Sequence, residues 1–295
     1  MNDRAQDPNE GGNRLSAAEN LPEFSKKEKD SIEAQSRPSA ALIHETIRAE
    51  GESELQRTVW ALLLSGVAAG LSIGFSLIVE GLIYARLPAA PWRELVSNFG
   101  YTVGFLIVVL GRQQLFTENT LTPVLPLLYH RDAATLWRVL RLWGVVLAAN
   151  MLGTWGIAAA LARTPIFPMD VAAAFSEISR SAVAGSFWTL FTKAIFAGWL
   201  IALMAWLLPS GAASRPLIII IISYVVGLGG FVHIVAGSVD AFYLVETGAM
   251  SWADYFGKFF FPVLLGNVVG GIALVAAFNY GQVAPEIAEE SAPQR

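Results

Sequence analysis

Six long apolar segments constrain the fold of this chain more than any other feature of its sequence. About 20 consecutive apolar residues let a helix span the hydrocarbon core of a bilayer. Segments of that length lie at roughly 58–84, 100–128, 137–162, 187–208, 216–242 and 256–280. The chain is 54% hydrophobic and 15% charged, with a mean hydropathy of +0.51, whereas soluble domains carry about 25% charged residues. We therefore predict an all-α, six-helix transmembrane bundle.

Two of these segments are interrupted by polar or glycine-rich sequence. In the second, RQQLFTENTLTP follows an apolar run that ends at Gly111, and in the fifth, LGGFVHIVAGSVDAF places glycines around His233. Non-helical backbone at membrane depth is tolerated only where it is buried in protein or lines a cavity. We predict that helices two and five are broken. A loop between two separate spans is the alternative for the second segment, but the apolar pieces on either side are each short for a span.

An Asn-x-x-Gly pattern recurs in the third and sixth segments, at Asn150–Gly153 and Asn267–Gly270, where we predict a structural role in helix packing. Thr117 lies 33 residues before Asn150, and His233 lies 34 residues before Asn267. The pattern predicts two repeats of three spans, inserted in opposite orientations because three is odd. Paired broken helices in inverted repeats point to a solute path near the membrane midplane.

Polar sequence flanks the apolar part and predicts three regions. Residues 1–55 are a polar tail, disordered at first and ending in a short amphipathic helix within 39–57. Residues 56–282 form the six-span domain, and residues 283–295 a polar C-terminal tail. Arg48 and Arg57 beside the first span favour a cytoplasmic N-terminus, so we expect both termini to be cytoplasmic.

His233 is an ionisable residue at membrane depth, which makes it a candidate functional residue. A hydrogen-bonded structural histidine is the alternative, but the glycine-rich break favours a role in a solute path. A histidine can exchange a proton near neutral pH, and Thr117 could orient it or contact the solute. Leu115, Phe116 and Phe231 predict hydrophobic constrictions that block hydrated ions, unless they only fill the core.

Further charged residues flank this proposed centre. Lys193 falls about two turns inside the fourth segment, where it either snorkels to the interface or, with Arg112, attracts an anion. We place Glu80 at the membrane interface. Asp240, with two further acidic residues, is expected to make the last external loop acidic.

Several classes of function are not supported by the sequence. We find no nucleophile–base set, phosphate-binding loop or metal-ligand spacing, and therefore predict neither an enzyme nor a cofactor or metal site. A net charge of −4 argues against nucleic acid as a partner. The expected partners are the lipid bilayer and a small solute.

The chain resembles the formate/nitrite transporter family over roughly residues 56–282. The matching pieces are LFT at 115–117, AANMLG at 148–153, KAIFAG at 193–198, FVHIVAG at 231–237 and PVLLGNVVGG at 262–271. The resemblance implies an aquaporin-like fold, a homopentamer in the bacterial inner membrane, and passage of small weak-acid anions such as formate, nitrite or hydrosulfide. By motif position, Thr117, His233 and Lys193 match the family's pore residues.

The chain departs from the family's pattern next to these residues. Val232 stands where the family usually has Glu, and Gly237 and Gly198 stand where Asn is usual. Gln114 replaces a frequent Glu and follows Arg112. The pore centre therefore loses polar groups relative to the family.

From these observations we predict channel-like transport of a small monovalent weak-acid anion, with proton transfer at His233 as the mechanism. A pore for small neutral solutes is one alternative, which the lost polar groups would suit. A membrane sensor or assembly protein with a closed pore is another.

Overall fold

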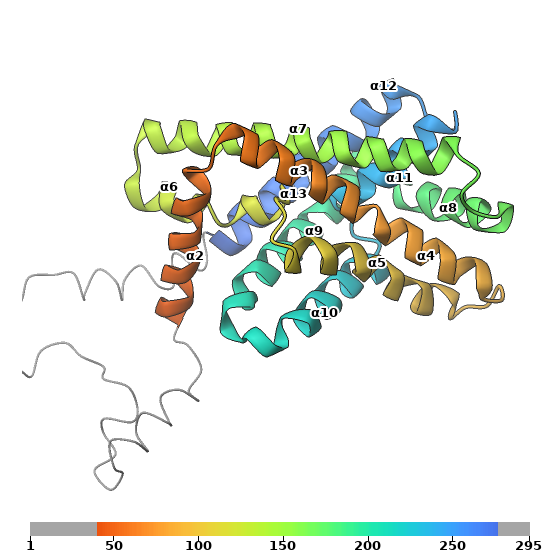
Figure 1. The fold of residues 1–295 in the computed structure, drawn as a ribbon, viewed down its shortest axis with the longest axis horizontal. Helices are drawn as coiled ribbons and strands as arrows, with labels where there is room; N and C mark the ends of the chain where they lie inside the picture. Colours follow the sequence, from red (N-terminus) through yellow and green to blue (C-terminus); the bar gives the residue numbers. More distant parts are fainter. Residues whose placement is uncertain (1–39, 277–295) are drawn as a thin grey trace, which may run out of the picture.

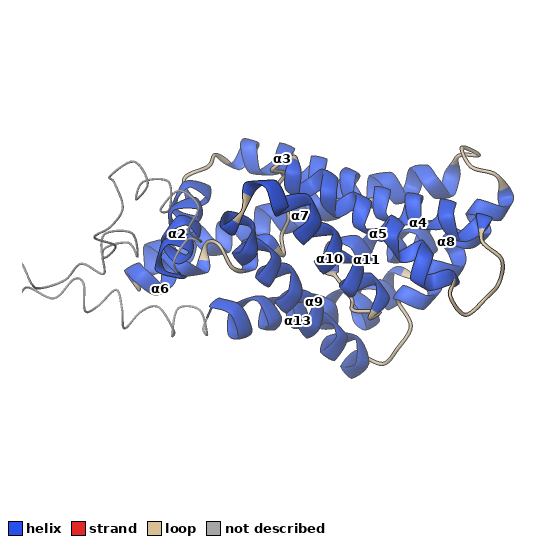
Figure 2. Cartoon of the chain, turned by 90° about the horizontal axis from the view of Figure 1, so that it is seen from below, coloured by secondary structure: helices blue, strands red, loops and turns tan. Residues whose placement is uncertain are grey.

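The computed structural model describes residues 40–276, and this part of the chain is helical with no strand. The α-helices, in chain order, are α2 (Ala40–Leu55), α3 (Val59–Ile73), α4 (Phe75–Arg86), α5 (Arg93–Leu110), α6 (Val124–His130), α7 (Ala133–Arg163), α8 (Met169–Ala182), α9 (Phe187–Leu207), α10 (Arg215–Leu228), α11 (Ile234–Glu246), α12 (Trp252–Asp254) and α13 (Phe261–Val269). The short 3-10 helices are η1 (Glu118–Thr120), η2 (Leu208–Ser210) and η3 (Ala212–Ser214), and two π-helical stretches are η4 (Tyr255–Phe260) and η5 (Gly270–Ala276). Figure 2 shows the helical bundle with its loops.

Five helical stretches are long and apolar enough to cross a membrane: Val59–Arg86, Arg93–Leu110, Ala133–Arg163, Phe187–Leu207 and Trp252–Ala273. The fifth predicted segment is instead divided between α10 and α11. The second begins earlier than expected, because α5 starts at Arg93 rather than near residue 100. Large apolar side chains such as Trp60, Leu64 and Trp137 are exposed on the outside, as a lipid-facing surface requires.

The small residues of the repeated Asn-x-x-Gly pattern bring two helix pairs into close contact. In the first half α3 packs against α7, and in the second α9 packs against α13. A Cβ on Gly153 would lie 2.8 Å from the Cα of Gly70. A Cβ on Gly270 would lie 2.8 Å from the backbone nitrogen of Trp199. These glycines therefore set the distance between the helices, as small residues do in membrane proteins.

Helix α11 lies at the centre of the fold. Every residue from Ile234 to Leu244 is buried. A helix at the surface of a protein, by contrast, exposes one polar face. It packs against α7, α8 and α3. Because α11 begins immediately after His233, it fixes that side chain inside the bundle.

The two ends of the molecule carry different elements. Figure 1 shows α2 and α6 at one end and α8 and α12 at the other. Helix α2 occupies the position of the predicted amphipathic helix, with Ile47 and Leu55 buried. The expected extramembrane loop at 163–186 contains α8. The predicted tails at 1–38 and 283–295 fall outside the described residues.

Candidate functional site

The first helix break begins where α5 ends. The N–H of Gln113 reaches back to the carbonyl of Val108 at 3.0 Å, a bond typical of a helix that ends with a left-handed residue. That residue is Arg112, whose φ is 50°. Few non-glycine residues adopt a left-handed backbone, and those that do are concentrated at functional sites.

The second break repeats this geometry after α10. The N–H of Phe231 reaches back to the carbonyl of Val226 at 3.0 Å, and Gly230 has a φ of 57°. Gly230 therefore occupies the position that Arg112 has in the first half. Glycine adopts this conformation without a steric cost.

Asn150 satisfies the backbone of the first break. Its Oδ1 accepts the N–H of Phe116 at 2.9 Å, and its Nδ2 donates to the carbonyls of Gln114 and Gly66, each at 2.8 Å. Unpaired backbone groups at membrane depth have no water to bind. The side chain of Asn150 therefore supplies the partners that the interrupted helix lacks.

Asn267 does the same for the second break. Its Oδ1 accepts the N–H of Ile234 at 2.7 Å, and its Nδ2 donates to the carbonyls of Val232 and Ala194, at 3.0 and 2.8 Å. The asparagine in each Asn-x-x-Gly pattern thus holds the break, while the glycine allows close helix packing.

These bonds fix the register of the two halves. Phe116 and Ile234 are equivalent because each donates its N–H to the clamping asparagine. It follows that His233 is the counterpart of Leu115, one residue before Phe116. Sequence spacing alone had set His233 beside Thr117, which is two positions away from its structural counterpart.

His233 and Thr117 nevertheless meet at the centre of the bundle. The Nε2 of His233 lies 2.5 Å from the Oγ1 of Thr117, and both residues are almost completely buried. The Nδ1 of His233 accepts the N–H of Ala236 at 3.0 Å, so His233 caps α11. A ring nitrogen that accepts a hydrogen bond carries no proton. The neutral ring therefore holds its proton on Nε2 and donates it to Thr117, while Phe105 packs against the ring edge-on at 5.2 Å.

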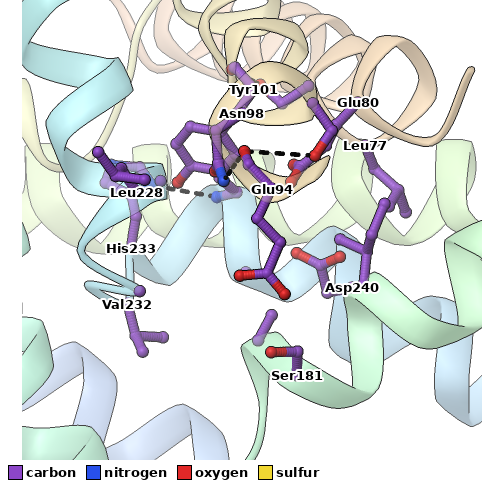
Figure 3. A pocket seen from close by; sticks show the side chains of 18 of the residues that line it. Leu77, Glu80, Glu94, Asn98, Tyr101, Ser181, Leu228, Val232, His233 and Asp240 are labelled. Atoms are coloured by element: carbon purple, nitrogen blue, oxygen red, sulfur yellow. Dashed lines mark hydrogen bonds between the residues drawn. The ribbon is translucent and has the colours of Figure 1, made fainter. Parts of the chain in front are cut away.

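A cavity of about 320 Å³ reaches His233 from the side of α4 and α8. We call it the first cavity, and Figure 3 shows it with His233 and Val232 at one side and Glu80 and Asp240 at the other. Lys193 also lines it. The Nζ of Lys193 comes within 3.6 Å of the position that a Cβ on Gly230 would take, so the ammonium group lies beside the second break.

A second cavity of about 410 Å³ lies on the side of α2 and is lined in part by Leu115. Arg112 lines it, but its side chain is 79% exposed and forms an ion pair with Glu50 at 3.6 Å. Lys193 and Arg112 thus belong to different cavities and do not form one positive vestibule. His233 lines the first cavity and Leu115 lines the second, whereas Thr117 lines neither. The Thr117–His233 hydrogen bond therefore connects the wall of the first cavity to the helix break that reaches the second.

The three apolar residues predicted to form constrictions have different surroundings. Leu115 is buried and lines the second cavity, and Phe231 lines the first, where its ring stacks on Phe196 at 5.3 Å. Phe116 lines neither cavity and packs against Trp143. Leu115 and Phe231 therefore each line one cavity, and Phe116 lies in the core.

Two acidic residues of the first cavity lie at positions other than those predicted from the sequence. Glu80, expected at the interface, is 8% exposed on α4, and Asp240, expected in an external loop, is 6% exposed on α11. Asp240 accepts a hydrogen bond from the hydroxyl of Ser179 at 3.0 Å. Its spacing of seven residues from His233 was the available signal, because residues two helical turns apart share a face.

Comparison with known proteins places this arrangement in a family. A family model described as formate/nitrite transporter matches residues 41–281. The chain belongs to the formate/nitrite transporter family. It is 44% identical to the inner membrane protein YfdC of Escherichia coli over 248 residues, covering 83% of this chain and 80% of that protein. It is 26% identical to the formate channel BtFdhC of Bacillus thuringiensis, covering 79% of this chain and 91% of that protein.

Solved structures of formate/nitrite transporters share the fold. A pentameric formate channel with formate bound aligns with a TM-score of 0.66 at 19% identity, covering 77% of this chain and 98% of that chain. An ion channel of the family aligns with a TM-score of 0.72 at 17% identity, covering 81% of this chain and 98% of that chain. At these identities the likeness concerns the fold alone.

The departures from the usual formate/nitrite transporter residues have steric correlates. A Cβ on Gly237 would lie 2.9 Å from the ring of Phe259, and a Cβ on Gly198 would lie 2.7 Å from the Cα of Asn267. Neither position has room for a larger side chain without a shift of its neighbours. Val232 is buried and lines the first cavity next to His233.

Proposed function

We propose that this protein is a channel-like transporter for a small monovalent weak-acid anion of the formate or nitrite type. The observation that carries the proposal is the buried Thr117–His233 hydrogen bond, which joins the two helix breaks between two cavities. A hydrogen-bonding centre with an apolar residue on either side, Leu115 and Phe231, gives a dehydrated solute polar contacts while it excludes hydrated ions. Family membership and the formate channels among the relatives support the same function.

In this proposal Thr117 is the residue that contacts the solute. Its Oγ1 accepts the Nε2–H of His233, which leaves the Thr117 hydroxyl proton available to donate to an anion or acid. His233 orients that hydroxyl. For His233 to relay a proton, Nδ1 would have to take one up and give up its bond to the N–H of Ala236. Loss of such a helix cap costs about 1 kcal/mol, so this geometry favours a neutral, orienting histidine over the proton relay expected from the sequence.

We further propose a homopentamer in the bacterial inner membrane, with both termini cytoplasmic. The name of the relative from E. coli supports the inner membrane, and a pentameric channel among the structural neighbours supports the assembly. The apolar exposed surface of α3 and α7, with Trp60, Leu64 and Trp137, is available to lipid or to neighbouring subunits.

Flux into proteoliposomes tests the proposed function. The purified full-length protein is reconstituted, and uptake of formate, nitrite and hydrosulfide is measured from about pH 5 to about pH 8, against protein-free liposomes. We expect uptake of at least one anion that saturates and depends on the protein. No uptake of any of them by an intact pentamer would contradict the proposal and favour a sensor or assembly role. Uptake of urea or glycerol alone would identify a pore for neutral solutes.

A further inference from the structure

The first cavity has an unexpected charge for the entrance of an anion pathway. Four carboxylates line it, from Glu80, Glu94, Glu177 and Asp240, against one ammonium, from Lys193. Their combined field repels a free anion. If a weak-acid anion is the solute, these carboxylates must do something other than attract it.

Glu80 stands apart from the other three acids. The residue is only 8% exposed, and it lines the cavity. Within residues 40–276, no hydrogen-bond donor or cation contacts its carboxylate. Glu177, by contrast, accepts the Tyr84 hydroxyl at 2.7 Å, and Asp240 accepts the Ser179 hydroxyl at 3.0 Å. An ionisable carboxyl group at membrane depth is a costly arrangement, and it marks a functional group by default.

The neighbours of Glu80 do not compensate its charge. Asp240 and Glu94 carry charge of the same sign and line the same cavity, and Figure 3 shows all three around it. Lys193 lines the cavity too but forms no ion pair within the described residues. The titratable or charged groups that line the cavity with Glu80 are Tyr84 on α4, Glu94 and Tyr101 on α5, Glu177 on α8, Lys193 on α9, His233 before α11 and Asp240 on α11. Arg93 of α5 lies over the ring of Tyr84, and α3 contributes no lining residue.

We propose that Glu80, with Asp240 beside it, is the proton-exchange site that converts the incoming anion into its neutral acid. Two carboxyl groups that share a buried site are complemented by a proton. His233 is not available for this step, because Nδ1 is held by the N–H of Ala236 and Nε2–H is donated to Thr117. The inference rests on the proposed function and assigns its proton donor to the cavity rather than to the central histidine.

The step balances in atoms and charge. The anion is attracted by the Lys193 ammonium, and the O–H bond of the Glu80 carboxyl group breaks as an O–H bond forms on the anion. The neutral acid then passes Phe231 and the Thr117–His233 pair without the cost of dehydrating a charge. The Glu80 carboxylate is then reprotonated by a hydronium ion from the solvent that enters the cavity. One proton is therefore carried with each anion.

Substitutions in the reconstituted pentamer test this assignment. Glu80→Gln keeps the shape of the side chain but cannot release a proton to the anion, whereas Glu80→Asp keeps a carboxyl group. Glu177→Gln is the matched control, because it removes one negative charge from the same cavity at an exposed, already hydrogen-bonded position. Formate is the probe, and its uptake is recorded together with the acidification of the liposome lumen by an internal dye.

We expect Glu80→Gln to lower formate uptake near about pH 7 by about tenfold or more, with a much smaller loss near about pH 5, where more of the solute is already protonated. Glu80→Asp should retain part of the uptake, and Glu177→Gln should retain nearly all of it. Equal effects of Glu80→Gln and Glu177→Gln would reduce the role of Glu80 to cavity charge and overturn the proposal. An unchanged pH profile in Glu80→Gln would overturn it as well.

A measurement independent of transport separates this inference from the proposed function. Infrared difference spectroscopy of the purified pentamer between about pH 5 and about pH 8 reports the C=O stretch of protonated carboxyl groups. We expect a titrating band that disappears in Glu80→Gln and persists in Glu177→Gln. Loss of the band with no formate uptake by the unmodified protein would leave the proton site standing and contradict the formate-type function. An unchanged band in Glu80→Gln would contradict the proton site whatever the solute.

Discussion

Thr117 contributes a single hydroxyl to the proposed path, so it can be tested with nearly isosteric variants. Thr117→Val removes the acceptor of the His233 Nε2–H and the donor offered to the solute, while it preserves the volume of the side chain. We expect formate uptake to fall about tenfold or more, equivalent to about 1.4 kcal/mol. Thr117→Ser keeps the hydroxyl and should retain most of the uptake. Equal uptake by Thr117→Val and the unmodified protein, with the pentamer intact, would remove Thr117 from the path.

His44 on α2 provides a pH-dependent test outside the membrane spans. Burial lowers the pKa of His44 below its usual 6.5. The His44 ring packs edge-on against the ring of Trp206, with 6.3 Å between the two ring centroids. Below pH 6.5 the unfolded chain binds a proton at this histidine that the folded chain does not. The free energy of unfolding therefore falls as the pH drops from 6.5 toward the lowered pKa. Above 6.5 the ring is neutral in both states and contributes no such dependence.

The comparison with His44→Phe isolates this contribution. Phenylalanine keeps an aromatic ring against Trp206 but does not titrate. We expect the melting temperature of the unmodified protein to drop more between about pH 7.5 and about pH 5.5 than that of the variant. Equal drops would show that His44 titrates alike in the folded and unfolded chains.

Individual site residues differed in how visible they were in the sequence. His233 was prominent because a histidine inside an apolar, glycine-rich segment has few structural explanations. Glu80 and Asp240 were not, because each lies near one end of an apolar run and hydropathy does not measure depth. Both are buried because α8, an element outside the apolar runs, packs against α4 and α11. No local pattern reports that contact.

At the scale of helices, the close contact between α3 and α7 depends on the absence of side chains. A Cβ on Gly153 would meet the backbone of α3 at the carbonyl of Val67 and at Gly70, whereas a Cβ on Gly144 would have nothing within 4 Å. Both glycines lie on α7. We expect Gly153→Ala to destabilise the protein by about 1–3 kcal/mol through overpacking. Gly144→Ala should be neutral or stabilising by up to about 1 kcal/mol, because alanine favours the helix.

Thermal unfolding of the purified detergent-solubilised protein measures both variants side by side. A melting temperature lowered by several degrees in Gly153→Ala but not in Gly144→Ala is the expected result. Similar values for the two would mean that α3 and α7 can separate without cost, and the packing role of the Asn-x-x-Gly pattern would be wrong.

The presence of the two helix breaks could be predicted from the sequence. The residue-by-residue correspondence between them could not. Polar residues after Gly111 and glycines before His233 both conflict with a continuous lipid-facing helix. The exact correspondence depends on which amide meets each asparagine, and a sequence offset of one or two residues leaves that open. Hydrogen bonds from Asn150 and Asn267 define it, and they pair His233 with Leu115. The halves are thus symmetric in backbone but not in chemistry.

At the scale of the whole molecule, the two cavities lie at opposite ends and have different charge. Carboxylates dominate the first, while Arg112 and Arg215 offset those of the second. This asymmetry follows from side chains that the inverted repeat does not constrain. An acidic entrance on one side fits a solute that takes up a proton there and leaves as an anion on the other side.

The membrane orientation of these cavities can be read with single cysteines, because the chain has none of its own. Ser181 is exposed and lines the first cavity, and Thr46 is exposed on α2 and lines the second. In the proposed orientation, with both termini cytoplasmic, the end that carries α2 would lie in the cytoplasm and the end that carries α8 outside (Figure 1). We expect a membrane-impermeant maleimide to label Ser181→Cys in intact spheroplasts and Thr46→Cys only after lysis. Labelling of Thr46→Cys from outside would reverse the orientation and would place the acidic cavity, with its proposed proton site, on the cytoplasmic side.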